Sequence, residues 1–315
     1  MDTNRHSLFT SNFREYGIFL QKLGFMFMIV LIIFSHFIPS YSGEYAAALI
    51  DKVERLESIE GAKIVLIGNS NVAYGFKSEL IEEKFGLPVV NMGFHGDFGN
   101  VFHEEMTKLN VCEGDIYIIC HSDYTDLGKI DHAPLVWAAI ENHPRLWRIL
   151  RAEDIWPVLK GFPVYLKKCI NRDMDGIRNQ EGLRDAFNEY GDICINKETG
   201  SDLFYEGAVY IPNISVKVMQ RINRLDKYLE KRGATLLIAG YPIGDGEYTP
   251  DKENFSNYRE NLQTFLTCPV ISDFTDYMFD YKYFYNSSLH LNEDGAVLRT
   301  EQLIEDLERY FQETK

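Results

Sequence analysis

The chain has 315 residues and a mass of 36.5 kDa, which fits one large domain or two small ones. Hydrophobic residues make up 45% and charged residues 25%, which excludes a wholly disordered chain, and 14% aromatic residues can build a sizeable core. The 47 Asp and Glu outnumber the 32 Lys and Arg, and the resulting charge of −15 argues against a nucleic-acid partner, because such a domain repels phosphate.

The first 42 residues form a separate unit that carries a candidate membrane helix. The segment Leu23–Ile38 contains no Asp, Glu, Lys or Arg. Extended back to Gly17, it reaches roughly 33 Å as a helix, enough to cross a hydrocarbon core of ~30 Å. Arg5, Arg14 and Lys22 precede the uncharged stretch that begins at Leu23. Because basic residues stay in the cytoplasm, the sequence predicts a single crossing with the N-terminus inside the cell.

Two other interpretations of this segment are a cleaved signal peptide and a buried core helix. Cleavage would fall after Ser40-Tyr41-Ser42, just before Gly43. The long stretch ahead of the apolar segment favours an anchor over a signal peptide, and the lack of a polar face argues against a core helix. Anchor and signal peptide both place residues 43–315 outside the cytoplasm, in the periplasm or outside the cell.

Five cysteines lie at positions 112, 120, 169, 194 and 268. None forms a CxxC pair and no histidine lies near them at ligand spacing, so neither a metal site nor a cofactor is expected. An exported domain allows one or two disulfides among them, but the sequence does not select the pairs.

From Ala62 onward, short apolar runs alternate with amphipathic stretches. The runs are continuously apolar, as in strands buried on both faces of a parallel sheet. Strands are expected at 63–68, 88–93, 115–120, 235–240 and 269–273, and helices at 77–85, 98–110, 215–232, 251–266 and 292–313. This alternation predicts an open, doubly wound α/β domain with a mainly parallel, five-stranded sheet.

The alternation breaks at 125–211, which is expected to be an insertion of helices and irregular chain. It holds all three tryptophans, Trp137, Trp147 and Trp156. An insertion after the third strand emerges at the carboxyl edge of the sheet, where ligands bind in such folds, so a cap over the site is one outcome. The alternative is that its tryptophans only pack the insertion onto the sheet.

Three segments with chemically useful residues follow predicted strands. Gly68-Asn69-Ser70 comes directly after the first strand. A serine in such a turn lies beside free backbone N–H groups, which suits a nucleophile, although an N-cap serine gives the same pattern. Asn91-Met92-Gly93-Phe94-His95-Gly96-Asp97 follows the second strand, where glycines leave N–H groups free to face an oxyanion. His290 lies on a loop just before the last helix.

In order and spacing these segments resemble the SGNH (GDSL-like) hydrolase family, over about residues 62–313 outside the insertion. The family has a flavodoxin-like α/β fold, and its Gly-Asp-Ser block is similar to Gly68-Asn69-Ser70. The family's Asn-x-Gly-x-x-Gly-Asp block matches the segment from Asn91 to Asp97, so the resemblance implies that Gly96 contributes to the oxyanion hole. In membrane-anchored members, His-Leu-Asn-x-x-Gly is similar to the segment from His290 to Gly295.

The resemblance implies that Ser70 is the nucleophile and that His290 takes its proton. The family places an aspartate three or four residues before the histidine, and here those positions hold Ser287 and Asn286. One outcome is a dyad oriented by an amide or a backbone carbonyl. The other is a carboxylate from elsewhere, for instance Asp123 or Asp97, in the orienting position.

The family's third block, Gly-x-Asn-Asp, supplies an asparagine to the oxyanion hole. After the third predicted strand this chain has His121-Ser122-Asp123 instead. We therefore expect an oxyanion hole made by Ser70, Gly96 and the hydroxyl of Ser122, with His121 or Asp123 as supporting groups or plain loop residues.

Two functions follow from this resemblance. The first is an exported, membrane-tethered serine esterase or O-acyltransferase that acts on acyl esters of a cell-surface glycan or a related polymer of the cell envelope. The alternative is a catalytically weakened or inactive SGNH-like module that binds a glycan or an assembly partner, because the orienting acid is missing.

Overall fold

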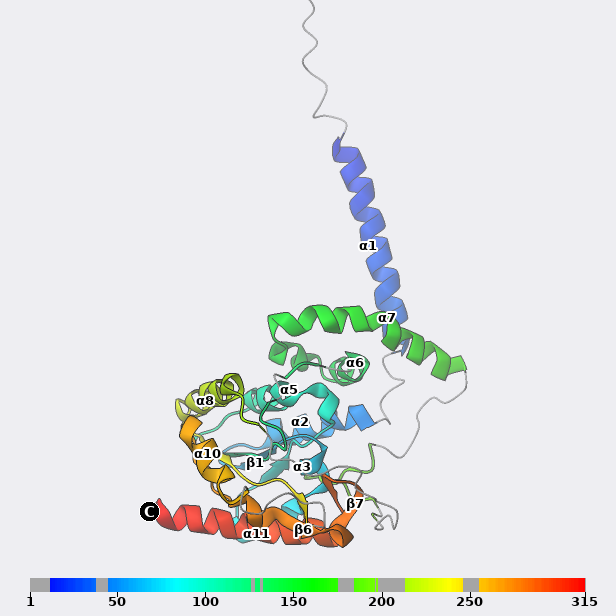
Figure 1. Ribbon diagram of the computed structural model, residues 1–315. Helices are drawn as coiled ribbons and strands as arrows, with labels where there is room; N and C mark the ends of the chain where they lie inside the picture. Colours follow the sequence, from blue (N-terminus) through cyan, green and yellow to red (C-terminus); the bar gives the residue numbers. More distant parts are fainter. Residues whose placement is uncertain are drawn as a thin grey trace, which may run out of the picture.

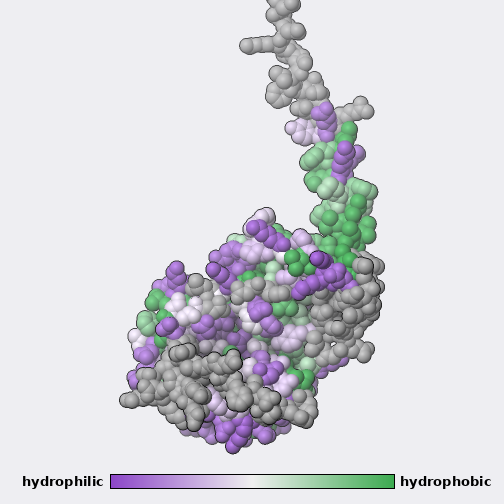
Figure 2. All heavy atoms as spheres, turned by 45° about the vertical axis from the view of Figure 1, so that its right-hand side comes forward, coloured by the Kyte–Doolittle hydropathy of each residue, from purple (hydrophilic) through white to green (hydrophobic). Residues whose placement is uncertain are grey.

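The computed structural model of the chain describes residues 12–37, 45–125, 128–130, 133–174, 184–195, 197, 213–245 and 255–314. One helix, α1 (Asn12–Phe37), projects from an α/β domain (Figure 1). From Glu15 to Ile33 it is long and apolar enough to span a membrane, and none of this segment is buried in the protein. Its apolar surface is continuous down to the domain (Figure 2). The interpretation as a buried core helix is therefore wrong.

A parallel sheet of four strands forms the centre of the domain, in the order β2-β1-β3-β4. The strands are β1 (Ile64–Ile67), β2 (Val89–Asn91), β3 (Ile116–Ile119) and β4 (Thr235–Ile238). Almost every strand residue is buried, which explains why these runs are apolar without alternation. The α/β class and the parallel sheet are thus as predicted.

The predicted fifth strand at 269–273 does not form a full strand. Val270 makes an isolated parallel bridge to Ile238 at the edge of β4, and Pro269 has no N–H to extend the ladder. Asp273 then caps a 3₁₀ turn by accepting from the N–H of Thr275. A five-stranded sheet is therefore not confirmed, because a proline and a capping aspartate confine pairing to one position.

Helices cover both faces of the sheet. The helices of the domain are α2 (Ala48–Ser58), α3 (Ser70–Tyr74), α4 (Ser78–Phe85), α5 (Asn100–Met106), α6 (Ala133–Asn142), α7 (Ala152–Met174), α8 (Val216–Glu230), α10 (Tyr258–Phe265) and α11 (Glu293–Glu313). The predicted helices at 77–85, 98–110, 215–232 and 292–313 each contain one of them. Residues 251–254 of the fifth predicted helix lie outside the described residues, and α10 forms its later part.

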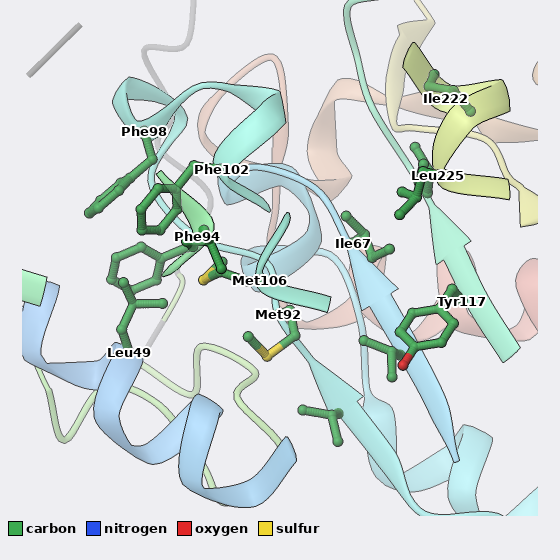
Figure 3. Close-up of a cluster of buried hydrophobic side chains, with 14 of the residues drawn as sticks. Leu49, Ile67, Met92, Phe94, Phe98, Phe102, Met106, Tyr117, Ile222 and Leu225 are labelled. Carbon is green, nitrogen blue, oxygen red and sulfur yellow. The ribbon is translucent and has the colours of Figure 1, made fainter. Parts of the chain in front are cut away.

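Alternate strand residues point to two apolar cores. On one face, the strands pack against α2, α5, α8 and α10, and Figure 3 shows part of this cluster with Ile67 and Tyr117 from the strands and Ile222 and Leu225 from α8. On the other face, the strands pack against α3, α4 and α11. Each buried Leu- or Ile-sized side chain contributes about 1.5–3 kcal/mol, so these two layers hold the sheet in place.

Two small sheets lie near the C-terminal part of the chain, where the sequence predicted none. The strands β5 (Ile243–Asp245) and β6 (Met278–Asp280) are parallel. The strands β7 (Phe284–Ser287) and β8 (His290–Leu291) form an antiparallel hairpin. This hairpin leads directly into α11, and it fixes where His290 lies.

The described part of the insertion begins with helices and continues, at residues 184–195, as irregular chain with one isolated antiparallel bridge between Phe187 and Ile193, as predicted. Helix α6 packs against α7, against α2 and against the 3₁₀ turns Tyr45–Ala47 and Gly96–Phe98, and α7 also contacts α1. Trp137 is buried, whereas Trp156 is 63% exposed. Packing inside the domain therefore accounts for the position of Trp137 but not for that of Trp156. A cap over the site stays a prediction for residues 198–211, which lie outside the described residues.

Candidate active site

The nucleophile turn connects β1 to the short helix α3. Asn69 is the N-cap of α3, and its Oδ1 accepts from the backbone N–H of Asn71 at 3.0 Å. The alternative that Ser70 is the N-cap is therefore wrong, and its hydroxyl remains available. Gly68 allows the close packing here, because a Cβ at this position would lie 2.4 Å from Cγ2 of Val72.

Ser70, His290 and Asn286 form a chain of two hydrogen bonds. The Oγ of Ser70 lies 2.8 Å from Nε2 of His290, and Nδ1 of His290 lies 2.7 Å from Oδ1 of Asn286. When Nδ1 carries the proton, it donates to Asn286 and leaves Nε2 bare to accept from Ser70. The β7–β8 hairpin supplies both His290 and Asn286, so it orients the ring against the serine.

The pKa of His290 is lowered to about 4. The main cause is burial, and the nearby His95 and Lys197 lower it further. At neutral pH the ring is therefore uncharged and can accept a proton from Ser70. Among its described hydrogen-bond partners there is no carboxylate, so protonating the ring is costly.

One side of the His290 ring is covered by Tyr74. The two rings are stacked with centroids 4.1 Å apart and an interplanar angle of 12°. Lys197, from the insertion, is buried and lies with Nζ 5.7 Å from the centre of the Tyr74 ring. Lys197 also lies 3.9 Å from a carboxylate oxygen of Glu293, which forms an ion pair with Lys77. Together these residues restrict the position of His290.

Two backbone N–H groups near Ser70 are open to a ligand. Within the part of the chain that the structure describes, the N–H groups of Ser70 and Gly96 donate to no other group. Gly96 lies next to Asn69, since a Cβ built on it would be 3.9 Å from the Asn69 Cβ. Ser122 also lies at this edge, where its Oγ accepts from Nδ2 of Asn69 at 3.3 Å. Gly96 and Ser122 therefore both lie beside Asn69, in the turn that contains Ser70.

The other candidate orienting residues make different contacts. The Oγ of Ser287 accepts from the N–H of Leu289 in the hairpin turn. A carboxylate oxygen of Asp123 accepts from the N–H and the hydroxyl of Thr125, and Asp97 lies beside His95. Among the described residues the hydrogen-bond partners of the His290 ring are Ser70 and Asn286, so the structure brings neither Asp123 nor Asp97 to it.

His121 is hydrogen-bonded to Glu104 and not to Ser70 or His290. It is fully buried, and its Nε2 lies 3.0 Å from Oε1 of Glu104, which also accepts from Arg221. The charges of Glu104 and Arg221 are thereby compensated inside the domain. His121 is a supporting residue of the core next to the site.

Arg299 joins the nucleophile turn to the last helix. Its guanidinium is fully buried and donates to the backbone oxygen of Asn71 at 2.7 Å and to that of Gly240 at 3.1 Å. It therefore connects the starts of α3 and α11 with the end of β4. No sequence pattern indicates this contact, because Arg299 looks like an ordinary charged residue on an amphipathic helix.

The loop of Gly93 and Gly96 is held by Asn91. Its Oδ1 accepts from the N–H of Gly93 at 2.9 Å, and its Nδ2 donates to the buried carboxylate of Asp192 at 2.7 Å. Asp192 comes from the insertion and also accepts from the hydroxyl and the N–H of Ser78. The insertion thus supports the oxyanion loop through a buried polar network.

Within the described residues, no group of three or more His, Cys, Asp or Glu side chains is arranged to hold a metal ion, and all five cysteines are free thiols. The contact between Ser70 and His290 is the arrangement of a serine beside a base. No protein family model matches the chain, and no curated protein is significantly similar to it.

Proposed function

We propose that this protein is a membrane-tethered, SGNH-like serine esterase or O-acyltransferase. The observation that carries the proposal is the chain from Ser70 Oγ through His290 to Asn286, with contacts of 2.8 and 2.7 Å. A serine held beside a neutral imidazole, with free N–H groups next to it, is the arrangement that acyl transfer needs.

The proposed reaction has two steps. Ser70 attacks the carbonyl carbon of an ester, its proton passes to Nε2 of His290, and the oxyanion is held by the N–H groups of Ser70 and Gly96 and by the polar side chain of Ser122. The C–O bond then breaks as His290 returns the proton to the leaving alcohol. Water, or a hydroxyl of an acceptor, next attacks the carbonyl carbon of the acyl-serine while His290 takes its proton. The bond from this carbon to Oγ of Ser70 then breaks, and His290 returns the proton to Oγ, which releases the acid or the new ester.

The proposed substrate is an acylated glycan or a related polymer of the cell envelope. The support is α1, which would hold the domain at a membrane, together with the likeness of the His290 segment to that of membrane-anchored SGNH proteins. A domain charge of this sign also disfavours nucleic acid as the polymer.

A fluorophosphonate probe tests the nucleophile. We expect the probe to label the chain, Ser70→Ala to lose the label completely, and His290→Gln to reduce the labelling rate by about 10²-fold or more, because the base is gone. Ser58→Ala is the matched control, since Ser58 is an exposed serine at the end of α2. Labelling that persists in Ser70→Ala would show that another serine reacts.

The second candidate is a non-catalytic module that binds a glycan or an assembly partner. It is favoured by one observation, the neutral amide of Asn286 in the position where a carboxylate would stabilise the imidazolium. A folded chain that binds acylated glycan but neither reacts with the probe nor hydrolyses esters would support this candidate over the enzyme.

Protease added to intact spheroplasts tests the orientation. With Arg14 and Lys22 on the cytoplasmic side of α1, we expect the C-terminal domain to be digested while a cytoplasmic marker protein survives. If the domain is digested only after the membrane is lysed, the N-terminus lies outside and the proposed orientation is wrong. If the domain is found free of the membrane and lacks α1, the segment is a signal peptide.

A further inference from the structure

Helix α7 exposes large apolar side chains on the side that faces away from the domain. Its inner side packs on α6 through buried residues such as Val158, Tyr165 and Cys169. Its outer face carries Ile155, Trp156, Leu159, Val164 and Ile170, with exposed fractions from 37% to 63%. A surface helix in water normally has a polar outer side, so five exposed large apolar side chains among the charged residues of α7 are unusual.

Helix α7 lies next to the candidate membrane helix. Helix α7 contacts α1, and Figure 1 shows it extending across the lower end of α1, at a steep angle to it, on top of the domain. Phe37 and Tyr45 are joined by only the seven residues 38–44, which can extend to roughly 29 Å at most. The domain therefore stays close to any membrane that α1 spans.

Three lysines of this helix suit the same environment. Lys160, Lys167 and Lys168 are exposed, and Nζ of Lys160 lies 5.2 Å from the centre of the Trp156 ring. Lysine and tryptophan side chains next to apolar residues are typical of helices that lie in the interface of a bilayer, and the lysines attract anionic headgroups.

We propose that α7 is an interfacial helix, whose outer face inserts into the bilayer surface from which α1 emerges. The inference rests on the proposed membrane insertion of α1 and goes beyond it. A single spanning helix lets a domain swivel and tilt, whereas a second, transverse contact fixes which side of the domain faces the lipid. Ser70 would then be held in a constant direction relative to the membrane.

Tryptophan quenching by brominated lipids tests this contact in the full chain. The chain is placed in liposomes of phosphatidylcholine and phosphatidylglycerol with brominated acyl chains. The emission of Trp156 is the difference between the unchanged chain and Trp156→Phe, because Trp137 and Trp147 are common to both. We expect roughly twofold quenching of this emission, and more from bromines near the headgroups than from deep ones, as for a helix in the interface.

Two further variants, both built on Trp156→Phe, separate this inference from its premise. Phe27→Trp reports on α1, and Phe265→Trp reports on α10, where Phe265 is 43% exposed and Figure 1 places the helix away from α7. We expect deep quenching for Phe27→Trp and none for Phe265→Trp. Quenching at Phe27→Trp without quenching of Trp156 would overturn the inference about α7, for instance because a protein partner covers it. The proposal that α1 spans the membrane would still stand. If the emission of Phe27→Trp is not quenched, both the membrane insertion of α1 and the inference about α7 are wrong.

Discussion

Replacement of Asn286 by aspartate is expected to accelerate ester hydrolysis at neutral pH by roughly ten- to a hundredfold. In the serine-protease triad, replacing the aspartate by asparagine lowers kcat by ~10⁴-fold, and we expect Asn286→Asp to recover part of such a factor. The Oδ1 of Asn286 already lies 2.7 Å from Nδ1 of His290, so an aspartate would fit the same position. Its carboxylate would stabilise the imidazolium that forms when Ser70 attacks.

A second reason for the gain is the tautomer of His290. An amide can present either its oxygen or its NH₂ group to Nδ1, and the NH₂ group selects the ring form that carries its proton on Nε2. That form cannot accept the proton of Ser70. A carboxylate can only accept, so Asn286→Asp would hold the productive tautomer at all times.

The same change should alter the pH profile in a defined direction. The base must be neutral to act, so activity of the unchanged protein is lost only as the pH falls through the pKa of His290, about 4. A carboxylate beside the ring favours the charged form and raises this pKa. We therefore expect the acid limb of kcat/KM to move upward in Asn286→Asp, with a large gain at pH 7 and a smaller one at pH 5.

Ser287→Asp is the matched control for this prediction. Ser287 is the other position at which the sequence allowed an orienting acid, but its hydroxyl accepts from Leu289 and does not contact the ring. We expect no gain from Ser287→Asp. A loss of activity in Asp123→Asn or Asp97→Asn, combined with no gain from Asn286→Asp, would mean that a distant carboxylate orients His290 during the reaction.

Neutralising Asp115 is expected to destabilise the domain by about 3–5 kcal/mol, because it leaves a buried charge without its partner. Asp115 and Lys63 have fully buried side chains, and Nζ of Lys63 lies 2.9 Å from Oδ2 of Asp115. Asp115 also accepts from the N–H groups of Lys63 and Cys112 and from the hydroxyl of Tyr117. No other carboxylate contacts Lys63 among the described residues.

Urea unfolding of the full chain in detergent measures this effect for Asp115→Asn. The control is Glu308→Gln, which removes an exposed ion pair with Lys84 and should cost less than ~1 kcal/mol. Lys63 and Asp115 precede β1 and β3, at the opposite edge of the sheet from Ser70. The folded Asp115→Asn protein should therefore keep its probe reactivity, and equal stability of the two variants would contradict the prediction.

The position of the site follows from features that the sequence contains. Parallel strands end at one edge of the sheet, so the segments after β1, β2 and β3 had to converge there. This is why the segments that contain Ser70, Gly96 and Ser122 could be placed at one edge from their order, whereas the choice of these residues within them came from the family resemblance. His290 could be added only because its segment resembles one in a known family.

The choice between Asn286 and Ser287 could not be made from spacing. It depends on the β7–β8 hairpin, in which Ser287 pairs with His290 across an irregular register. The hydroxyl of Ser287 accepts from the N–H of Leu289 in the turn of this hairpin. Lys197 escaped prediction for a different reason, since it comes from an insertion without periodicity and reaches Tyr74 only through the tertiary fold. Such contacts arise between segments far apart in the chain, and local patterns do not encode them.

The contacts of Arg299 have a consequence for the order in which the protein is made. Ser70 and His290 are 220 residues apart, and Arg299 follows both. At ~5–20 residues per second, roughly 10 to 45 s of synthesis separate the serine from its base. During that time the nucleophile turn lacks both the imidazole and the guanidinium that holds Asn71. Under the proposed function, a growing chain would therefore be unreactive toward esters, and Ser70 would gain its base only after the C-terminal helix has been synthesised and has packed against α3.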